Sequence, residues 1–289
     1  MIEVEPFSRV IWRWGVPPKY KTALTASHRA MSWAEYESVV RGYRRCDVVH
    51  LYPETWDKEL KRFAKDGLYF VPIRRAKPVS GFAHKFYEPT GGRFMVYGVV
   101  SPSLSDAMRF ARAHKERSCD HETIGILLGY PECCVRFFVE NFPKGVLDPV
   151  WRVEHEEEDP MLNVMLRYFG PRIIPFFPCS YTCRQARRVA EKFYDLLREY
   201  DEDLAETILE MLSMPMVWSM YKSVIQVTTP LFTGICNGYW EPQRINVYWK
   251  GDPERWAKEL PLQYKWFLSE VGFQFGGEAA KFFAQSGQA

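Results

Sequence analysis

Apolar and polar positions recur with two different periods in the first hundred residues. Three short apolar runs bounded by turn residues are typical of strands, and the stretches between them have the period of a helix. Strands are predicted at Asp47–Tyr52, Leu68–Ile73 and Arg93–Val100, and helices at Trp33–Arg45 and Thr55–Lys65. Ser32 and Glu35 have the spacing of a capping box, which predicts that the first of these helices begins there.

Between Ser103 and Tyr200 the period is mostly helical. Helices are predicted at Leu104–Lys115, Thr123–Leu128, Pro131–Asn141, Pro160–Phe169 and Cys179–Tyr200. The last of these carries a continuous apolar stripe formed by Ala186, Val189, Ala190, Phe193, Leu196 and Leu197. A further helix is predicted at Glu202–Met211.

Strand patterns return at Ser223–Thr229 and Arg244–Trp249, before a helical tail rich in Trp and Phe. Strands at both ends with helices between them predict an α+β fold, with a mixed or antiparallel sheet and a helical cysteine-bearing segment inserted between early and late strands. We expect an α/β N-terminal part at residues 1–102, a helical cysteine-motif segment at 103–200, and C-terminal strands and a helix at 201–289. The late strands would complete the early sheet in one compact domain.

Composition places the chain among ordinary globular proteins. Hydrophobic residues make up 47% and charged residues 26%, which excludes wholesale disorder. The net charge of +2 does not by itself indicate a nucleic-acid or membrane partner. Three arginines nevertheless gather at Arg184, Arg187 and Arg188. A nucleic-acid partner therefore stays open but is not favoured.

The chain lacks the patterns of a membrane or secreted protein. No apolar run approaches the roughly 20 residues that a membrane helix needs, and the start MIEVEPFSRV has acids where a signal peptide is basic and then apolar. We therefore expect a cytoplasmic protein with no membrane partner. Scarce Asn with plentiful Glu, Arg and Lys is typical of a thermophile. Seven cysteines in the cytosol indicate thiols or metal ligands, although thermophiles also keep cytosolic disulfides.

Four of the seven cysteines lie near predicted helix starts. In the run LGYPECCVRFF, Pro131 suits the first turn of a helix and places Cys133 and Cys134 in that turn. In FPCSYTC a proline again precedes a helix, with Cys179 near its start and Cys183 one turn further on the same face. Helix N-termini present unpaired N–H groups that stabilise thiolates. The four sulfur atoms are therefore predicted to meet at one point, as a metal ion or an iron–sulfur cluster requires.

Several interpretations of these cysteines remain open. A metal site is favoured, with an iron–sulfur cluster as first choice and zinc as second, because aromatic residues near the motifs would shield a cluster from water. These are Phe137, Phe138, Phe176, Phe177 and Tyr181. Adjacent cysteines diverge by about 100° on a helix, so one of Cys133 and Cys134 is free to point into the core and leave three thiolates with an open metal position. The alternatives are a redox pair or disulfide, and ordinary buried thiols.

The motifs GYPECC and PCSYTC, with Asn163 and Arg167 before the second, resemble those of an uncharacterised prokaryotic family, domain of unknown function 483. The resemblance covers roughly residues 100 to 235, including a PxxW…TPxF pattern that begins at Pro215. It implies that the cysteines act together. It implies no particular activity and no substrate.

Polar residues near the cysteine motifs are candidates for catalysis and substrate binding. His121, His155 and Asp159 are the candidates for moving protons. Asp159, Asn163 and Arg167 recur every four residues and would form one polar stripe on the predicted helix, where Asn163 and Arg167 would bind a polar substrate or a carboxylate. The plainer interpretation is that the acids favour a helix start and that the histidines are ordinary polar residues.

The leading hypothesis is a metalloprotein that binds an iron–sulfur cluster or zinc through Cys133, Cys134, Cys179 and Cys183. An enzyme is favoured over a protein without catalytic activity. Its reaction is unknown. The second hypothesis is an adaptor or binding protein in which the same cysteines form a closed structural zinc site. The third is a nucleic-acid-modifying protein that uses the arginines after the second motif as its contact face.

Overall fold

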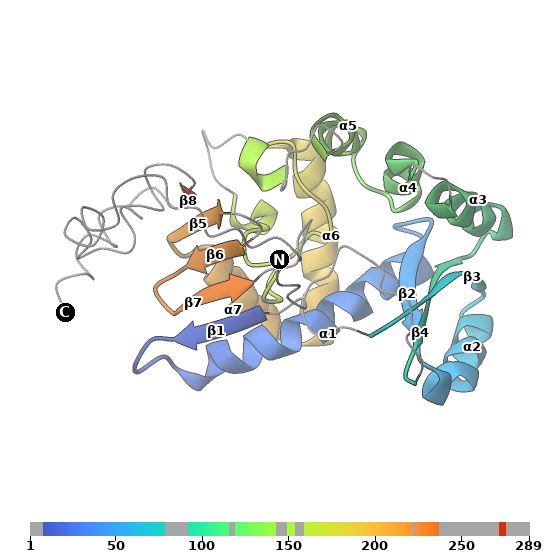
Figure 1. Ribbon diagram of the computed structural model, residues 1–289, viewed down its shortest axis with the longest axis horizontal. Coiled ribbons are helices and arrows are strands. Elements are labelled where there is room, and N and C mark those ends of the chain that lie inside the picture. The colour runs from blue at the N-terminus through green and yellow to red at the C-terminus, as the bar shows by residue number, and fades with distance from the viewer. Residues whose placement is uncertain are drawn as a thin grey trace.

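The structure is a computed structural model that describes residues 8–78, 92–115, 119–142, 149–153, 159–221, 224–236 and 272–275. Helices lie between two antiparallel sheets, a large one and a small one, at opposite ends of the molecule (Figure 1). The cysteine-bearing segment lies between the early and the late strands along the chain. The predicted α+β class is therefore confirmed.

The large sheet has the strand order β1-β7-β6-β5-β8. Its members are β1 (Ser8–Trp12), β5 (Met216–Tyr221), β6 (Val224–Thr228), β7 (Phe232–Cys236) and β8 (Gly272–Phe275). β5, β6 and β7 are consecutive antiparallel neighbours, and β1 joins the edge of β7 with Ser8 opposite Cys236. The apolar pattern predicts only β6 among them, because β5 and β7 interrupt the alternation with Ser219 and Gly234.

The small sheet has the order β2-β4-β3 and confirms the three early strand predictions. Its members are β2 (Asp47–Leu51), β3 (Tyr69–Ala76) and β4 (Met95–Ser101). Neighbouring residues of the central strand β4 face opposite layers, as the pleat requires. Val100 packs with Phe63 of α2 (Trp56–Lys65), whereas Val99 packs with Phe110 of α3 (Leu104–Lys115).

The late strands do not complete the early sheet. β5, β6 and β7 pair with one another across short connections, and β1 and β8 occupy the two edges of that sheet. Nearest-neighbour antiparallel pairing loses little chain entropy, which favours the pairing of β5, β6 and β7 with one another. The prediction of a single sheet is therefore wrong.

Helix α1 (Pro18–Val40) runs from one sheet to the other and packs against α6 (Arg184–Tyr200) and α7 (Glu202–Leu212) (Figure 1). The prediction that it begins at Ser32 is wrong, because Pro18 is its first residue and Ser32 lies inside it. Small residues fill many of its buried positions, so large apolar side chains do not mark its first half. These buried small residues are Ala23, Ser27, Ala30 and Ala34.

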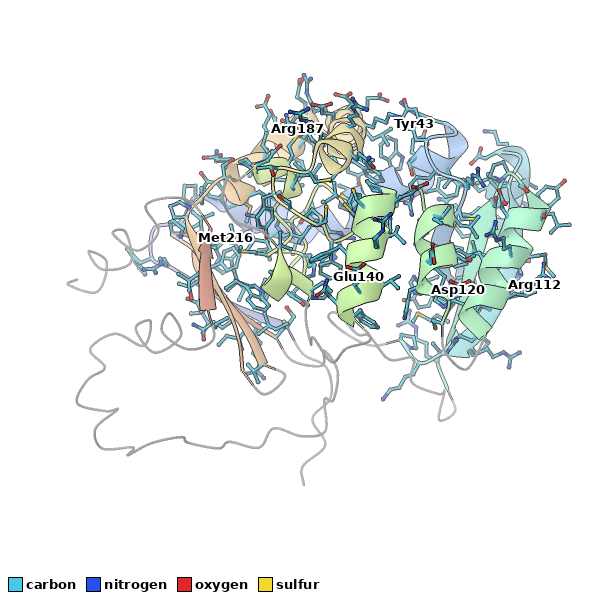
Figure 2. The ribbon with its side chains drawn as sticks, turned by 90° about the horizontal axis from the view of Figure 1, so that it is seen from above. Tyr43, Arg112, Asp120, Glu140, Arg187 and Met216 are labelled. Atoms are coloured by element: carbon cyan, nitrogen blue, oxygen red, sulfur yellow. The ribbon has the colours of Figure 1, made fainter. Side chains whose placement is uncertain are left out.

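Helices α3, α4 (His121–Leu127) and α5 (Glu132–Asn141) lie side by side in a row (Figure 2). Asp120 caps α4 by accepting the Thr123 N–H at 3.0 Å. Gly129 then adopts a φ of 72°, which glycine tolerates best and which ends the helix. Pro131 is the N-cap of α5, so the turn places the motif cysteines in the first turn of that helix, as predicted.

The predicted helix Pro160–Phe169 is wrong. A short 3-10 turn, η4 (Pro160–Leu162), forms there, and the residues after it are irregular. Every residue from 161 to 169 is buried, so this segment lacks the polar face of a surface helix. The Asn163 side chain also accepts the Met165 N–H at 3.0 Å, which competes with helical hydrogen bonding. Two other 3-10 turns are η1 (Pro53–Thr55) and η3 (Pro149–Arg152).

The predicted strand Arg244–Trp249 and most of the predicted helical tail lie outside the described residues. The described part of that tail, Gly272–Phe275, is strand β8. Within the part of the chain that the structure describes, no helix is both long enough and apolar enough to span a bilayer.

Candidate metal centre

Two helix starts and one loop bring the four motif cysteines together. Cys133 and Cys134 are the second and third residues of α5. Cys183 is the N-cap of α6, and its Sγ accepts the Ala186 N–H at 3.5 Å. Cys179 lies in the loop before α6, so the prediction that it shares a helix face with Cys183 is wrong. The helix begins only at Arg184, after Cys183 has taken the capping position.

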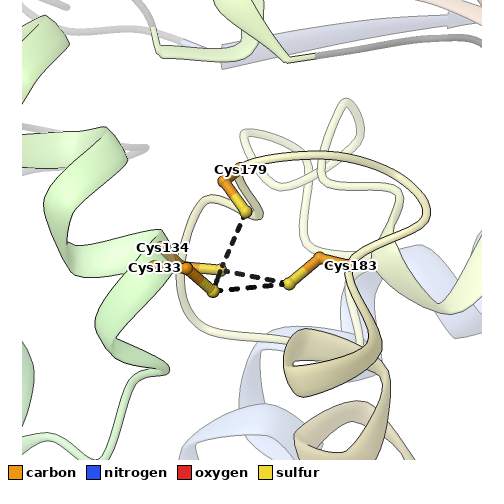
Figure 3. Close-up of side chains that lie close together, drawn as sticks. All are labelled: Cys133, Cys134, Cys179 and Cys183. Carbon is orange, nitrogen blue, oxygen red and sulfur yellow. Dashed lines mark hydrogen bonds between the residues drawn. The ribbon is translucent and has the colours of Figure 1, made fainter.

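The four sulfur atoms form one compact group (Figure 3). The Cys133 and Cys183 sulfurs are 3.6 Å apart. The Cys134 sulfur lies 3.9 Å from each of the sulfurs of Cys133, Cys179 and Cys183. All four lie within 4.8 Å of one another. The predicted convergence of these cysteines is therefore confirmed.

This spacing fits a single metal ion. Four sulfurs at about 2.3 Å from one zinc ion lie about 3.8 Å apart at the corners of a tetrahedron. Cys133 and Cys134 both take part, because their sulfurs lie together instead of diverging around the helix. The expectation that one of these two sulfurs points away from the group is therefore wrong. No His, Asp or Glu among the described residues joins the four sulfurs.

The pKa values of Cys133, Cys134 and Cys179 are shifted because their sulfurs are buried and interact with one another. Hydrogen bonding from the Cys134 thiol lowers the pKa of Cys179 to about 6. Donating that proton, together with burial, raises the pKa of Cys134, and burial raises the pKa of Cys133 to about 11. Four thiolates at this spacing would repel one another strongly. A metal cation compensates this repulsion and displaces the thiol protons.

An apolar cavity of about 220 Å³ lies beside the cluster. Cys134 and His121 both line it, together with Phe138 and Phe177. The His121 ring packs against the rings of Phe138 and Phe142, with centroids 5.4 and 5.1 Å away, and burial lowers its pKa. His121 is thus near the cysteine centre and neutral near pH 7, and its role in proton transfer stays a prediction.

Two further predicted site residues, Asp159 and Asn163, are held by protein contacts. Asp159 caps η4 by accepting the Met161 N–H at 3.0 Å and pairs with Arg187 of α6. Asn163 is fully buried, and its side chain donates to the Leu212 carbonyl at 2.8 Å. His155 lies outside the described residues. Catalytic roles for His155 and Asp159 stay predictions.

Arg167 supports the loop that carries Cys179. It is 5% exposed, donates to the Val164 carbonyl at 2.8 Å, and places its guanidinium over the Phe177 ring at 4.7 Å. Because the segment is not helical, Asp159, Asn163 and Arg167 do not form the predicted stripe along a helix. Substrate binding by Asn163 and Arg167 stays a prediction.

The three arginines of α6 differ in their surroundings. Arg184 and Arg188 are exposed, whereas Arg187 pairs with Asp159 and with Glu191. All three line an open cavity of about 490 Å³ (Figure 2 labels Arg187). That a nucleic acid contacts these three arginines stays a prediction.

Sequence reasoning missed two residues that line cavities around the cysteine motif. Tyr130, inside GYPECC, lines the apolar cavity beside Cys134 and a second, charged cavity on another side. Arg44 lines the charged cavity and is 5% exposed. Its position in the chain carries no signal of this burial. The GYPECC motif could have drawn attention to Tyr130.

Residues 96–213 match the family described as "Protein of unknown function (DUF483)". This confirms, over that segment, the resemblance that the two cysteine motifs indicate. Cys133, Cys134, Cys179 and Cys183 all lie inside this matched segment. No solved structure matches the chain.

Two curated relatives are also similar to part of the chain. An uncharacterized protein of Methanocaldococcus jannaschii is 31% identical over 102 residues, which cover 32% of this chain and 52% of the relative. An uncharacterized protein of Methanothermobacter thermautotrophicus is 42% identical over 69 residues, covering 23% of this chain and 35% of the relative. The chain thus spans about half the length of the first relative and about a third of the second.

Proposed function

We propose that Cys133, Cys134, Cys179 and Cys183 bind one metal ion in a closed site with four thiolate ligands, and that this ion is zinc. The ion would join the start of α5 to the loop and cap that precede α6. The spacing of the sulfur atoms is the observation that carries this proposal.

The spacing favours one ion over the iron–sulfur cluster that the aromatic surroundings suggest. In a four-iron cluster each cysteine binds a different iron, and sulfide ions separate the irons. The cysteine sulfurs must then lie farther apart than around a single shared ion. The contacts of 3.6–3.9 Å between sulfurs match the single ion without any movement of α5 relative to α6.

A closed site points to a structural role for the metal. Four protein thiolates complete the tetrahedron that zinc prefers, whereas catalytic zinc keeps one position for water or substrate. The described surroundings supply no acid or imidazole within the sulfur group that could exchange with a thiolate. We therefore place the protein in the binding class, with a zinc centre that holds the walls of the neighbouring cavities, and not among enzymes that act at the metal.

The test is the metal and acid-labile sulfide content of protein purified without oxygen, with its visible absorption spectrum. We expect a colourless protein with about one zinc per chain and no sulfide. A brown protein with about four iron and four sulfide per chain would overturn the proposal in favour of a cluster. A single iron without sulfide would keep the four-thiolate site and replace zinc as its ion.

A further inference from the structure

A second cavity, of about 420 Å³, lies against β2 and is lined largely by charged residues. Its walls come from α1, β2, α2 and the residues on either side of Gly129. The residues used below are Glu35, Arg44, Asp47, Tyr130 and Arg172. None of them binds the metal, and the cavity volume is within the range of about 300–1,000 Å³ that is usual for small-molecule sites.

A buried ion pair forms part of the cavity wall. Arg44 is 5% exposed and Asp47 is 4% exposed. The Arg44 Nε donates to the Leu128 carbonyl at 2.6 Å, and its Nη1 lies 3.4 Å from the Asp47 Oδ1. Burying two charges costs more free energy than such a long contact recovers. Burial accordingly raises the pKa of Asp47 to about 7, and a ligand that adds hydrogen bonds to this pair would offset the cost.

A second pair lines the same cavity with an even longer contact. The Arg172 Nη2 lies 3.9 Å from the Glu35 Oε1, and both side chains are mostly buried. Well-formed surface pairs in this protein are shorter: Lys19–Glu210 at 2.6 Å, Arg41–Glu199 at 2.7 Å and Arg187–Glu191 at 3.1 Å. Charge-assisted hydrogen bonds typically measure about 2.7–2.9 Å. Arg44, Arg172, Asp47 and Glu35 thus retain bonding capacity, whereas Arg62 and Glu59, which also line the cavity, pair with each other at 2.9 Å.

Tyr130 lines the cavity together with these four charged residues. Burial is the main cause that raises the pKa of its hydroxyl. Arg44 and Arg172 oppose this shift in the Tyr130 pKa, and Glu35 and Asp47 add to it. The Arg44 guanidinium lies 5.7 Å from the centroid of the Tyr130 ring, and Glu35, Asp47 and Arg172 line the same cavity. The cavity is therefore a mixed-charge site and not a basic or an acidic one.

The edge of β2 adds backbone groups to this site. Among the described residues, β2 is an outer strand of the small sheet and pairs with β4 alone. Val48 and Val49 line the cavity, although their side chains point to opposite faces of the sheet, so the cavity runs along the strand edge. An outer strand presents N–H and C=O groups on its free side. These groups match the polar atoms of an amino acid.

We propose that this cavity binds a small zwitterion of the α-amino-acid class, its carboxylate between Arg44 and Arg172 and its ammonium group against Asp47 and Glu35. A purely anionic ligand would meet the carboxylates of Asp47 and Glu35, and a purely cationic one would meet the guanidinium groups of Arg44 and Arg172. A zwitterion satisfies both pairs and replaces their long contacts by short ones. The proposal does not depend on which metal the cysteines bind.

The binding test uses the metal-loaded full chain and the twenty standard L-α-amino acids as separate probes, by calorimetry and thermal shift. We expect at least one to bind saturably and to raise the Tm. Its decarboxylated amine and its deaminated carboxylic acid should each bind at least about tenfold more weakly, since each loses one charge contact. A probe concentration of about 10 mM is high enough to detect even a millimolar Kd. If none of the twenty binds saturably at that concentration, the proposal is overturned. Equal binding of the amine or the acid would overturn it too.

Variants connect the binding to the cavity. Arg172→Met should weaken binding of the best probe at least about tenfold, because one guanidinium contact is lost. The double variant Arg44→Met with Asp47→Leu replaces the buried pair by apolar residues that can pack in its place, so it keeps the fold and should lose binding. Arg41→Met is the matched control, because Arg41 pairs with Glu199 on the surface away from the cavity. Unchanged affinity in both cavity variants would overturn the proposal.

Discussion

Cys134 is the residue with the most contacts within the cysteine centre. Its sulfur lies 3.9 Å from each of the other three, and its side chain is the only buried one of the four. Cys179, by contrast, lies in the loop before α6, so no helix fixes its position. The metal would therefore order the Cys179 loop more than it orders α5. A substitution at Cys179 tests the metal site while leaving both helix starts unchanged.

We expect Cys179→Ser to lose most of its bound metal and to lower the free energy of unfolding by several kcal/mol. Structural zinc contributes roughly 10–16 kcal/mol of apparent binding free energy, part of which is stability, and three thiolates hold the ion less firmly. Metal analysis and thermal unfolding of the variant provide the measurement. Cys119→Ser is the control, since Cys119 is a half-buried thiol outside the cluster. Equal metal content in the two variants would contradict a four-thiolate site.

At the scale of elements, the irregular segment after η4 supports the large sheet. Phe169 ends this segment and packs against β7, where its ring lies directly over Gly234. A Cβ built on Gly234 would lie 2.5 Å from the Phe169 Cζ. The close approach of this segment to the sheet thus requires glycine at one position of β7.

Gly234→Ala is expected to destabilise the protein by about 1–3 kcal/mol, because the added methyl group overpacks a buried contact. Chemical denaturation measures this loss. The double variant with Phe169→Leu should recover part of it, since the smaller side chain makes room for the methyl group. Additive effects of the two substitutions would show that the contact between β7 and this segment is not the cause.

At the scale of the whole molecule, the cysteine centre lies between the two sheets and joins α5 to the α6 layer. α5 belongs to the row of helices that leads to the small sheet, whereas α6 packs with α1 and α7 (Figure 1). Tyr130, next to α5, lines both the charged and the apolar cavity. A metal in this position would hold the row of helices against the main core.

Removal of the metal by a chelator should speed amide hydrogen exchange near residues 128–136 and 179–187, where the ligands anchor the chain. The strands β5 to β7 should keep their protection, because their pairing involves none of the cysteines of the centre. Hydrogen exchange with mass spectrometry provides the measurement, and readdition of zinc is the control. Uniform loss of protection across the chain would mean that the metal stabilises the fold as a whole.

The amino-acid sequence by itself determined the α+β class, the strands β2, β3 and β4, the helix α3, and the set of four cysteines. These depend on local physical chemistry: the alternation of apolar residues, a serine or proline at a helix start, and thiols close to that start. Asp120 likewise caps α4 through a contact only three residues long. Such signals survive without knowledge of what packs against them.

Only the tertiary structure decided the features that depend on distant partners. α1 extends to Pro18, but most buried positions of its first half are small residues, so the apolar pattern does not mark the contact with α6 and α7. Asn163 ends a helical pattern because it bonds backbone groups inside the core. The spacing of the four sulfurs and the long Arg172–Glu35 contact depend on how separate segments meet. A residue pattern records whether a position is buried, whereas packing decides which surface buries it.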